Sequence, residues 1–414
     1  MKAPTLKFCN DHEVYNSDTL IELVKVSGGA TPLKANKLYW ENGTIPWLSS
    51  QEIGSRFVSE GTYTITELAI TDKTTRMVEK GTILMVTRSG ILARKVPLSI
   101  TKTNLAINQD IKALIPKSNH LSSTYLYYWL KKNEFILLNK IVKTGTTVQS
   151  INLPDLEKLC ISYPNITIQN KIADFFTLLD HRIEKQQEKV EAWRKYKKGM
   201  VQKLFSQELR FKDEDGKEFP KWDSKHLKNL GEFKKSYSYS RALEGEGDYK
   251  HIHYGDIHTK YNGILGYEVD FPNISVDGPL ETLEENDVVF ADASEDYKDL
   301  GKAVVVCGII NKKVVAGLHT HRFSPAKDID SRYLMYYTKS KEYEKFVRKY
   351  GTGVSVLGLS KSNLSSLVVP IPHLDEQNKI ADLLSKIDNK ILKEDSRLDI
   401  LTEEKKGFMQ QMFI

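Results

Sequence analysis

Two segments of this chain carry apolar residues at alternating spacings of four and three, which is the pattern of a helix with one continuous apolar seam. They run from about residue 167 to 206 and from about residue 375 to 414. The seam residues are Ile172, Phe176, Leu179, Ile183, Val190, Trp193, Met200 and Leu204 in the first segment, and Ile380, Leu384, Ile387, Ile391, Leu398, Leu401, Phe408 and Met412 in the second. Because Thr167 and Asp375 are residue types that favour the N-cap, we expect the helices to begin there.

Polar residues interrupt both seams at equivalent places, Gln186 with Glu394 and Lys197 with Lys405. Polar seam positions of this kind specify register and partner at some cost in stability. A helix of about 40 residues spans about 60 Å, which is longer than a domain of ordinary size. We therefore expect each helix to project from its domain and to pair with the other in antiparallel orientation. The alternative is a helix buried in the core of its own domain.

The two helical segments are copies of one design. The sequence QNKIADFFTLLD at Gln169–Asp180 returns as QNKIADLLSKID at Gln377–Asp388, 208 positions later. The same offset relates Lys197–Phe205 to Lys405–Phe413. Repeats of solenoid proteins are much shorter, about 20–50 residues. The repeat therefore indicates a duplicated domain followed by a duplicated long helix.

Shorter patterns before each helix predict mixed α/β domains. Thr62–Leu68 alternates polar and apolar residues, and Gly81–Val86 is a short apolar run, so both read as strands. Thr124–Lys132 reads as a helix with aromatic residues facing a core. In the second half, Asp287–Ser294 and Tyr333–Ser340 occupy the corresponding places.

The predicted fold is α+β, with two mixed α/β domains separated by two long antiparallel α-helices that form a coiled coil with pseudo-twofold symmetry. The expected boundaries are 1–165 for the first domain, 166–207 for the first helix, 208–373 for the second domain and 374–414 for the second helix.

Composition adds modest constraints. The net charge is +6 and charged residues make up 28% of the chain, which permits a polyanionic partner without requiring one. No apolar run approaches the roughly 18–20 residues of a membrane span, so we expect a cytoplasmic protein without a membrane partner. Cys9, Cys160 and Cys307 are scattered, and they support neither a disulfide framework nor a zinc ribbon.

Signs of catalysis are weak. The sequence contains no phosphate-binding loop and no methyltransferase signature. Pro154–Lys158 resembles part of a nuclease pattern, but Glu157 and Lys158 are adjacent and follow a predicted strand. The HxH pairs, His251 with His253 and His319 with His321, raise a metal hypothesis, with two imidazoles on one strand face. Because no cysteine lies nearby to complete a typical zinc set, we expect no metal at these histidines. If the polyanionic partner is DNA, they would serve its polar readout, and otherwise they would be buried. We expect no catalytic residues and no cofactor.

Sequence-specific DNA binding calls for Arg or Lys to reach guanine, Asn or Gln to reach adenine, and small residues or backbone N–H groups to reach phosphates. Loop residues of these types in the first domain are Ser49, Ser50, Gln51, Arg88, Ser89, Asn108, Gln109, Lys143, Thr144, Thr146 and Thr147. In the second domain they are Tyr237, Tyr239, Arg241, His251, His253, Tyr254, Lys298, His319, His321, Arg348, Lys349 and Thr352.

With these features the chain resembles the specificity subunits of type I restriction–modification systems over essentially its whole length. The landmarks are GGATP at Gly28–Pro32, GTILMVTRSG at Gly81–Gly90, GTTVQSINLPDL at Gly145–Leu156 and PIPHLDEQNKIA at Pro370–Ala381. The first of them adds Gly28, Gly29 and Thr31 to the DNA-binding candidates. There are two departures. Ile168 stands where the second copy has Glu376, and Phe233–Ala242 replaces a GGxP segment.

The resemblance implies a non-catalytic subunit that binds double-stranded DNA at a bipartite target. Each domain would read one half-site, and the paired helices would set the gap between the half-sites and dock two methyltransferase subunits, with two motor-nuclease subunits as an option. The assembled complex would be an adenine DNA methyltransferase and, with the nuclease, an ATP-dependent endonuclease. The alternatives are a stand-alone DNA-modifying enzyme, an orphan DNA-binding module and a coiled-coil scaffold.

Overall fold

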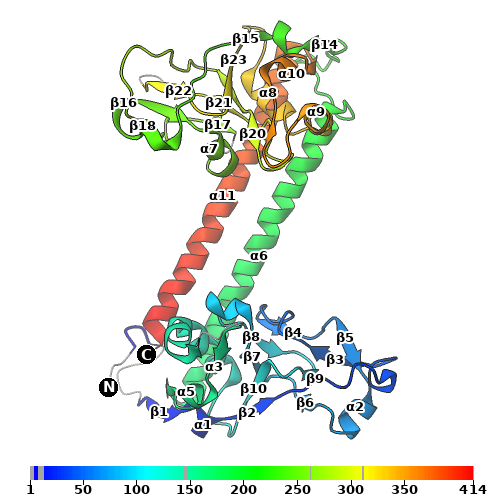
Figure 1. The fold of residues 1–414 in the computed structure, drawn as a ribbon, viewed down its shortest axis with the longest axis vertical. Helices are drawn as coiled ribbons and strands as arrows, with labels where there is room; N and C mark the ends of the chain where they lie inside the picture. Colours follow the sequence, from blue (N-terminus) through cyan, green and yellow to red (C-terminus); the bar gives the residue numbers. More distant parts are fainter. Residues whose placement is uncertain (1–3, 8–13, 144–147, 262, 310–311, 414) are drawn as a thin grey trace. The chain divides into compact units, whose positions relative to one another are not determined.

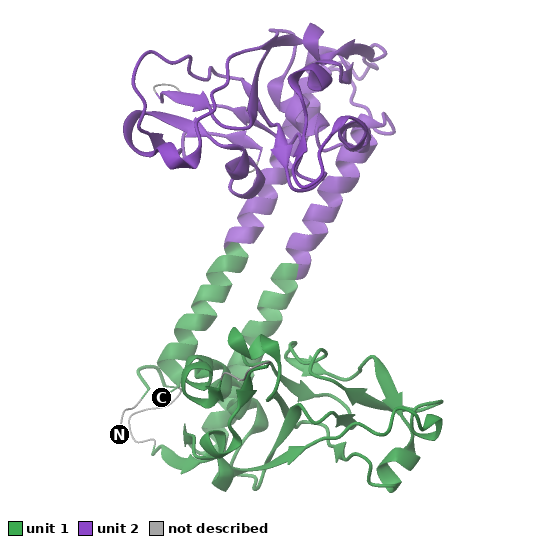
Figure 2. Cartoon of the chain, in the orientation of Figure 1, with its two compact units in different colours: residues 1–187, 397–414 green, residues 188–396 purple. Residues whose placement is uncertain are grey.

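A computed structural model describes residues 4–7, 14–143, 148–261, 263–309 and 312–413 (Figure 1). The chain divides into two compact units, residues 1–187 with 397–414 and residues 188–396 (Figure 2). Each unit contains one mixed α/β domain and a part of each long helix. The division into four segments that the sequence suggested stays a prediction.

Among its described residues, the first unit contains two larger sheets and two short two-stranded sheets, β1 (Asn16–Thr19) with β13 (Cys160–Tyr163) and β11 (Val142–Lys143) with β12 (Ser150–Ile151). The five-stranded sheet has the order β2 (Val24–Gly28), β10 (Ile111–Pro116), β7 (Ile83–Val86), β8 (Leu98–Thr101) and β4 (Phe57–Val58). The four-stranded sheet has the order β5 (Tyr63–Ile65), β3 (Ile45–Leu48), β9 (Leu105–Ile107) and β6 (Met77–Val78). The strand expected at Gly81–Val86 is thus confirmed as β7.

The strand expected at Thr62–Leu68 is only half right. It stops at Ile65, and helix α2 (Glu67–Thr71) follows with Thr66 as its N-cap residue. Glu67 in the first turn favours this helix because a carboxylate there complements the positive end of the helix dipole.

The second unit repeats the order of the five-stranded sheet, and within the described residues its smaller sheet has one strand fewer. Its larger sheet has the order β15 (Gly231–Phe233), β23 (Thr320–Pro325), β19 (Val288–Ala291), β21 (Ala303–Val306) and β17 (Ile264–Leu265). The smaller sheet has the order β18 (Asn273–Ile274), β16 (Glu244–Ile252) and β22 (Val314–Ala316). Strands β3 and β9 of the first unit run parallel, as do β16 and β22 here. The duplicated fold expected from the sequence is confirmed by this shared strand order.

Helices cover the larger sheet of each unit. Helix α3 (Ser123–Lys132) buries Tyr125 and Tyr128 in the first core, and α8 (Ser331–Tyr337) buries Tyr333 and Tyr336 in the second. Besides the long helices and five short 3-10 or π helices, the remaining α-helices and strands of the described residues are α1 (Leu20–Leu23), α4 (Glu134–Ile136), α5 (Leu153–Glu157), β14 (Asp223–His226), α7 (Tyr254–Thr259), β20 (Ala293–Ser294), α9 (Lys341–Tyr350), β24 (Leu357–Gly358), α10 (Lys361–Ser365) and β25 (Val368–Ile371).

The long helices are α6 (Ile166–Phe205) and α11 (Leu374–Met412). Each begins one residue before the expected N-cap, so Thr167 and Asp375 lie in the first turn instead. At α6 the cap is Asn165, whose side-chain oxygen accepts a hydrogen bond from the Ile168 N–H at 3.1 Å. Asp375 is still favourable inside the first turn because of the helix dipole. None of the helices in the described ranges is both long and apolar enough to cross a membrane.

The two helices pack against each other in antiparallel orientation within each unit. In the first unit, Phe175 near the start of α6 lies 5.2 Å from Phe408 near the end of α11, and Phe176 lies 5.5 Å from Phe413, between ring centroids. In the second unit, Leu204 near the end of α6 belongs to the same apolar cluster as Leu384 near the start of α11. The seam residues are buried, except that Ile183, Trp193, Met200, Leu398 and Phe408 are half-buried. Their assignment to helix pairing as a set stays a prediction.

Candidate nucleic-acid interface

Strand register brings the candidate loops of the first domain to one edge. Parallel β3 and β9 pair Leu48 with Ile107, so Ser49–Gln51 and Asn108–Gln109 leave the sheet side by side. Strand β10 begins at the following turn and pairs with both β2 and β7, so the segments after those strands lie at the same edge. We call this the first loop edge, and it comprises Gly28, Gly29, Thr31, Ser49, Ser50, Gln51, Arg88, Ser89, Asn108 and Gln109.

The first loop edge holds side chains of two kinds. Gln51, Arg88 and Gln109 are exposed. The side chain of Gln109 is held in place by another residue of this edge, because the Thr31 hydroxyl donates to Gln109 Oε1 at 2.8 Å. Asn108, in contrast, is buried and donates to Asp110 at 3.2 Å, which argues against direct contact with a base.

Glu52 braces the loop after β3. The backbone N–H and the hydroxyl of Ser49 both donate to Glu52 Oε2, at 2.9 and 2.6 Å. Burial raises the pKa of the Glu52 carboxyl, but hydrogen bonds from Ser49 and Thr62 outweigh it and leave the pKa lowered. The ionised carboxylate therefore engages the Ser49 hydroxyl, and the exposed Gln51 beside it is the better candidate for a base.

Gly29 is required by close packing at this edge. A Cβ at this position would lie 1.9 Å from the carbonyl oxygen of Ile107. The first glycine-rich landmark of the sequence thus has a structural role, because it lets the loop after β2 approach β9 closely.

The sequence interpretation missed Lys112, which lies at the first loop edge. Its Nζ donates to the Gln109 carbonyl at 3.2 Å, and a Cβ on Gly28 would lie 2.8 Å from that nitrogen. The one signal was a lysine in the otherwise apolar strand β10.

Gln149 and Ser150, at the start of β12, lie next to Arg88 and Ser89. The backbone of Arg88 bridges to Ser150, and the Ser89 N–H donates to the Gln149 carbonyl at 3.1 Å. Lys143, at the end of β11, is exposed and forms an ion pair with Asp155 at 3.2 Å. The candidates Thr144, Thr146 and Thr147 lie outside the described residues.

The second domain has an equivalent edge with aromatic character. Parallel β16 and β22 pair Ile252 with Ala316, so Tyr254 and His319 follow neighbouring strand ends. Their rings meet edge to face with centroids 5.3 Å apart. Tyr237 and Tyr239 stack on each other at 5.1 Å, and the backbone carbonyl of Tyr239 accepts from Leu318 in the same turn at 3.0 Å. We call Tyr237, Tyr239, Tyr254 and His319 the second loop edge.

Asp292 holds two of the histidines. Its carboxylate lies 3.1 Å from His319 Nδ1 and 3.6 Å from His321 Nε2. His319 adopts the left-handed backbone conformation, with φ +54°, and half of its side chain is exposed. His321 is less exposed and also lies 3.1 Å from the Leu359 carbonyl. His319 is therefore the histidine best presented to a ligand.

The pair His251 and His253 does not share a strand face as expected, because β16 ends at Ile252. His251 is 0% exposed and lies 3.2 Å from Glu244 Oε1, which argues against DNA contact. His253 is the N-cap residue of α7, and its Nδ1 accepts from the Gly255 N–H at 3.1 Å. Burial, followed by the nearby Arg241 charge, lowers the pKa of His253, which suits this acceptor role. Over the described part of the chain, no group of three or more His, Cys, Asp or Glu is placed to hold a metal.

The remaining candidates of the second domain surround β20 and β24. Lys298 follows β20, whereas Arg348, Lys349 and Thr352 precede β24, which pairs with β20. Arg348 is also bonded to Glu344 at 2.9 Å. Arg241 is separate from this group. It forms an ion pair with Asp256 at 2.9 Å, and more than half of its side chain remains exposed.

An apolar groove lies on the helix pair of the second unit. Its volume is about 500 Å³, and it is lined by Lys189, Ala192, Trp193, Tyr196, Leu383, Lys386, Ile387 and Lys390. Tyr196 is 49% exposed. In the first unit the positions equivalent to Lys386 and Ala192 carry Leu178 and Ile400, which are 60% and 59% exposed. Both units therefore leave apolar surface uncovered on the helix pair.

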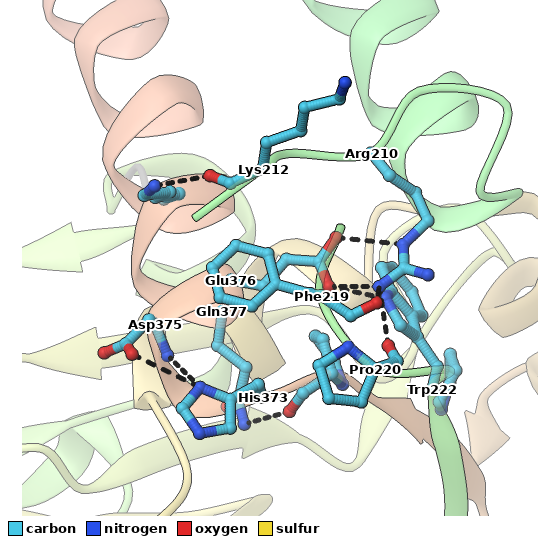
Figure 3. Close-up of polar contacts among 12 residues, drawn as sticks. Arg210, Lys212, Phe219, Pro220, Trp222, His373, Asp375, Glu376 and Gln377 are labelled. Atoms are coloured by element: carbon cyan, nitrogen blue, oxygen red, sulfur yellow. Dashed lines mark hydrogen bonds and ion pairs between the residues drawn. The ribbon is translucent and has the colours of Figure 1, made fainter. Parts of the chain in front are cut away.

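Glu376 anchors the start of α11 within the second unit (Figure 3). Its buried carboxylate accepts from Arg210 at 2.7 and 3.1 Å and from Trp222 Nε1 at 3.0 Å. Arg210 also donates to the Pro220 carbonyl at 2.7 Å, so the segment after α6 is tied to α11. The equivalent Ile168 is buried in the first apolar core. At this position the first unit therefore uses apolar packing where the second unit uses a buried polar network.

Comparisons with known proteins agree on one family. The family model described as a type I restriction modification DNA specificity domain matches residues 13–192 and again residues 220–399. The chain is 36% identical over 162 residues to the EcoR124I/EcoR124II specificity subunit of Escherichia coli, a match that covers 39% of this chain and 40% of that protein. It is 28% identical over 293 residues to the MjaIX specificity subunit of Methanocaldococcus jannaschii, covering 67% of this chain and 66% of that protein. The chain thus matches less than two thirds of the length of these relatives.

Two solved structures share the fold. The S subunit of a type I restriction–modification system from M. genitalium has a TM-score of 0.60 at 17% identity, over 100% of this chain and 99% of that chain. The second is a chain from a structural study of how the type I R-M system assembles and changes conformation. It has a TM-score of 0.59 at 13% identity, over 96% of this chain and 97% of that chain.

Proposed function

The chain belongs to the type I restriction–modification DNA specificity family, and from this premise we propose that it reads a bipartite site in double-stranded DNA for such a complex. The observation that carries the proposal is the pair of loop edges. Two domains of one strand order present loops of different sequence at equivalent strand ends. A shared scaffold with different loops suits two readers of two different half-sites.

The first loop edge supplies direct readout of base edges. Arg88 offers the fork of donors that fits guanine O6 and N7, and the amides of Gln51 and Gln109 fit adenine N6 and N7. Lys112 adds positive charge for phosphates, which position a protein on DNA without specifying sequence.

The second loop edge uses other chemistry for the second half-site. His319 can donate or accept with its free ring nitrogen, since Nδ1 faces Asp292. The stacked Tyr237 and Tyr239 offer hydroxyls and flat apolar surface, and Lys235 lies 5.0 Å from the Tyr237 ring.

We propose that α6 and α11 act as the spacer between the half-sites. Two helices that pair in antiparallel orientation along one apolar seam form a stiff coiled coil. Its length would set the spacing of the half-sites, as dimer geometry does in other DNA-binding proteins.

The uncovered apolar surfaces on the helix pair are the proposed docking places for two methyltransferase subunits, one on each unit. Lys189, Lys386 and Lys390 rim the groove of the second unit, so a helix with an apolar stripe and acidic flanks would fit it. Two motor-nuclease subunits would join the complex as an option. The chemistry, adenine methylation and ATP-dependent cleavage, would belong to those partners. Because chromosomal DNA is the proposed ligand, we place the protein in the cytoplasm.

The test is to produce the chain with and without the methyltransferase subunit of its own system, and to map methylated adenines across the host genome. We expect one bipartite motif that appears only when both proteins are present. Adenine methylation by the chain alone would contradict the proposal and favour a stand-alone enzyme. Salt-dependent DNA binding without any complex formation would favour an orphan DNA-binding module.

A further inference from the structure

Asp180 joins one domain to both long helices in the first unit. The Tyr128 hydroxyl, on α3, donates to Asp180 Oδ2 at 2.7 Å, and Lys405, on α11, forms an ion pair with Asp180 Oδ1. The ammonium of Lys405 also lies 5.8 Å from the centre of the Tyr128 ring. Only 13% of the Asp180 side chain is exposed. We call Tyr128, Asp180 and Lys405 the first junction.

The second unit contains the same arrangement 208 positions away. The Tyr336 hydroxyl, on α8, donates to Asp388 Oδ2 at 2.8 Å, and Lys197, on α6, forms an ion pair with Asp388 Oδ1. The ammonium of Lys197 lies 5.5 Å from the centre of the Tyr336 ring. Tyr336, Asp388 and Lys197 form the second junction, and each member is offset by 208 from its counterpart.

Each junction combines residues from both halves of the chain. In each junction the tyrosine and the aspartate come from one half of the chain, whereas the lysine comes from the helix of the other half. Lys197 and Lys405 are the polar interruptions of the two seams, so the junctions account for these interruptions.

In each junction the carboxylate is stabilised by a protonated tyrosine hydroxyl and by a lysine ammonium. Burial, followed by the charge of Asp180, raises the pKa of Tyr128, and burial followed by the charge of Asp388 raises that of Tyr336. Both hydroxyls therefore remain protonated donors. Removing one partner of a largely buried ion pair is strongly destabilising because the other charge is left uncompensated.

The apolar seam alone does not select one register. A slide of one heptad would place apolar residues opposite apolar residues again, but it would move each lysine about 10 Å from its aspartate. Both ion pairs would break. Lys405, Lys197 and Asp388 would each lose a partly buried ionic partner, whereas Asp180 would keep Arg56, whose Nη1 lies 3.5 Å from Asp180 Oδ2. The junctions thus penalise every register except the native one.

We propose that Asp180 and Asp388 are positioning residues that select the register of the α6–α11 pair and thereby fix the gap between the two half-sites. The inference rests on the proposed spacer function of the helices. A slip of one heptad corresponds to about 10 Å, or about three base pairs of B-form DNA. Loss of the junctions should therefore broaden or shift the accepted gap while both half-sites remain readable.

The experiment uses the full chain with its methyltransferase subunit and a series of synthetic duplexes. Every duplex carries the two half-sites found by methylation mapping, with gaps from three base pairs shorter to three longer than the natural one. The test variant combines Asp180→Asn with Asp388→Asn. The matched control combines Asp174→Asn with Asp399→Asn, two exposed aspartates on the same helices.

We expect the wild type and the control to methylate the natural gap with the same preference over the altered gaps. In the test variant this preference should fall by about tenfold, equivalent to about 1.4 kcal/mol. A variant that loses overall rate but keeps the wild-type preference for one gap would overturn the proposal, because the junctions would then only stabilise the fold. Absence of sequence-specific methylation in the wild type would instead contradict the proposed function.

A second experiment, which exchanges the charges of Lys197 and Asp388, tests the proposal even if the first variant does not fold. Lys197→Asp and Asp388→Lys alone should each impair folding or gap preference, and the double exchange should restore both at least in part. A double exchange no better than the single variants would overturn the proposal, because the pairing of these two residues would then not be what selects the register.

Discussion

Gln169 and Gln377 make the same three hydrogen bonds, 208 positions apart. Gln169 accepts from the Ser122 N–H at 2.9 Å and donates to the His120 and Pro164 carbonyls at 2.8 and 2.9 Å. Gln377 accepts from the Asp330 N–H at 3.0 Å and donates to the Asp328 and Pro372 carbonyls at 3.2 and 3.0 Å. Both side chains are buried, so each domain is joined to its long helix by one repeated polar contact.

This contact predicts the effect of Gln377→Leu. The substitution preserves most of the side-chain volume but leaves three backbone groups without their partner, of which the Pro372 carbonyl is buried and the other two are partly buried. We expect a loss of about 1–3 kcal/mol in the free energy of unfolding, measured by urea denaturation. Gln410→Leu, at an exposed position of α11, is the control and should change it by less than about 0.5 kcal/mol. Equal effects of the two substitutions would contradict this account of the joint.

Arg88→Ala should relax recognition of the first half-site alone. Loss of a bidentate contact to guanine costs about 1–3 kcal/mol of discrimination at one position. The measurement is competitive binding of the assembled complex to duplexes with single base changes in each half-site. Uniform weakening over all sequences would identify Arg88 as a phosphate contact instead.

His319→Gly should affect the second half-site in the same assay. Glycine accepts the left-handed backbone conformation at this position, so the turn is preserved while the imidazole is removed. We expect relaxed discrimination at one position of the second half-site and an unchanged melting temperature. Unchanged discrimination would exclude His319 from direct readout.

Gly29→Ala should disrupt the first loop edge. The added methyl group would lie 1.9 Å from the Ile107 carbonyl oxygen, so the loop or strand β9 must move. We expect destabilisation of about 1–3 kcal/mol together with weaker binding of the first half-site. Gly54→Ala provides the control, because a Cβ there would meet no atom within 4 Å. A variant at position 29 that is as stable as the control would show that the edge is pliable.

Lys339 should make the stability of the second unit depend on pH. Burial, followed by the charge of Lys197, lowers the pKa of Lys339 to about 7 from 10.5. Between these values the unfolded chain binds more protons than the folded chain, so stability should rise with pH. From pH 7 to pH 8.5 we expect the wild type to gain about 1–2 kcal/mol relative to Lys339→Met, measured by urea denaturation. Parallel pH profiles would show that Lys339 stays charged in the folded chain.

Much of the fold follows from local sequence. The heptad seams predicted α6 and α11, and the apolar run before Arg88 predicted β7, because periodicity reflects backbone geometry over a few residues. The same reasoning failed at Thr66, where strand alternation gives way to a helix start. Capping at Asn165 was missed for a similar reason, since Thr167 is equally good by residue type.

Burial separated the candidate site residues from one another. Arg88, Gln109, Asn108 and His251 were all reasonable from residue type, yet Asn108 and His251 are buried in polar contacts. Exposure depends on contacts with residues far away in the sequence, so residue type alone could not separate these four.

By itself, the sequence determined the duplication, the two long helices and the places where their seams turn polar, because all three are visible in spacing along the chain. Only the tertiary structure decided what those polar positions contact. Lys405 meets Asp180 across 225 positions, and the loops after β2, β3, β7 and β9 reach one edge through strand register. Such contacts depend on how segments far apart in the sequence come together in the fold, and no local sequence pattern specifies that.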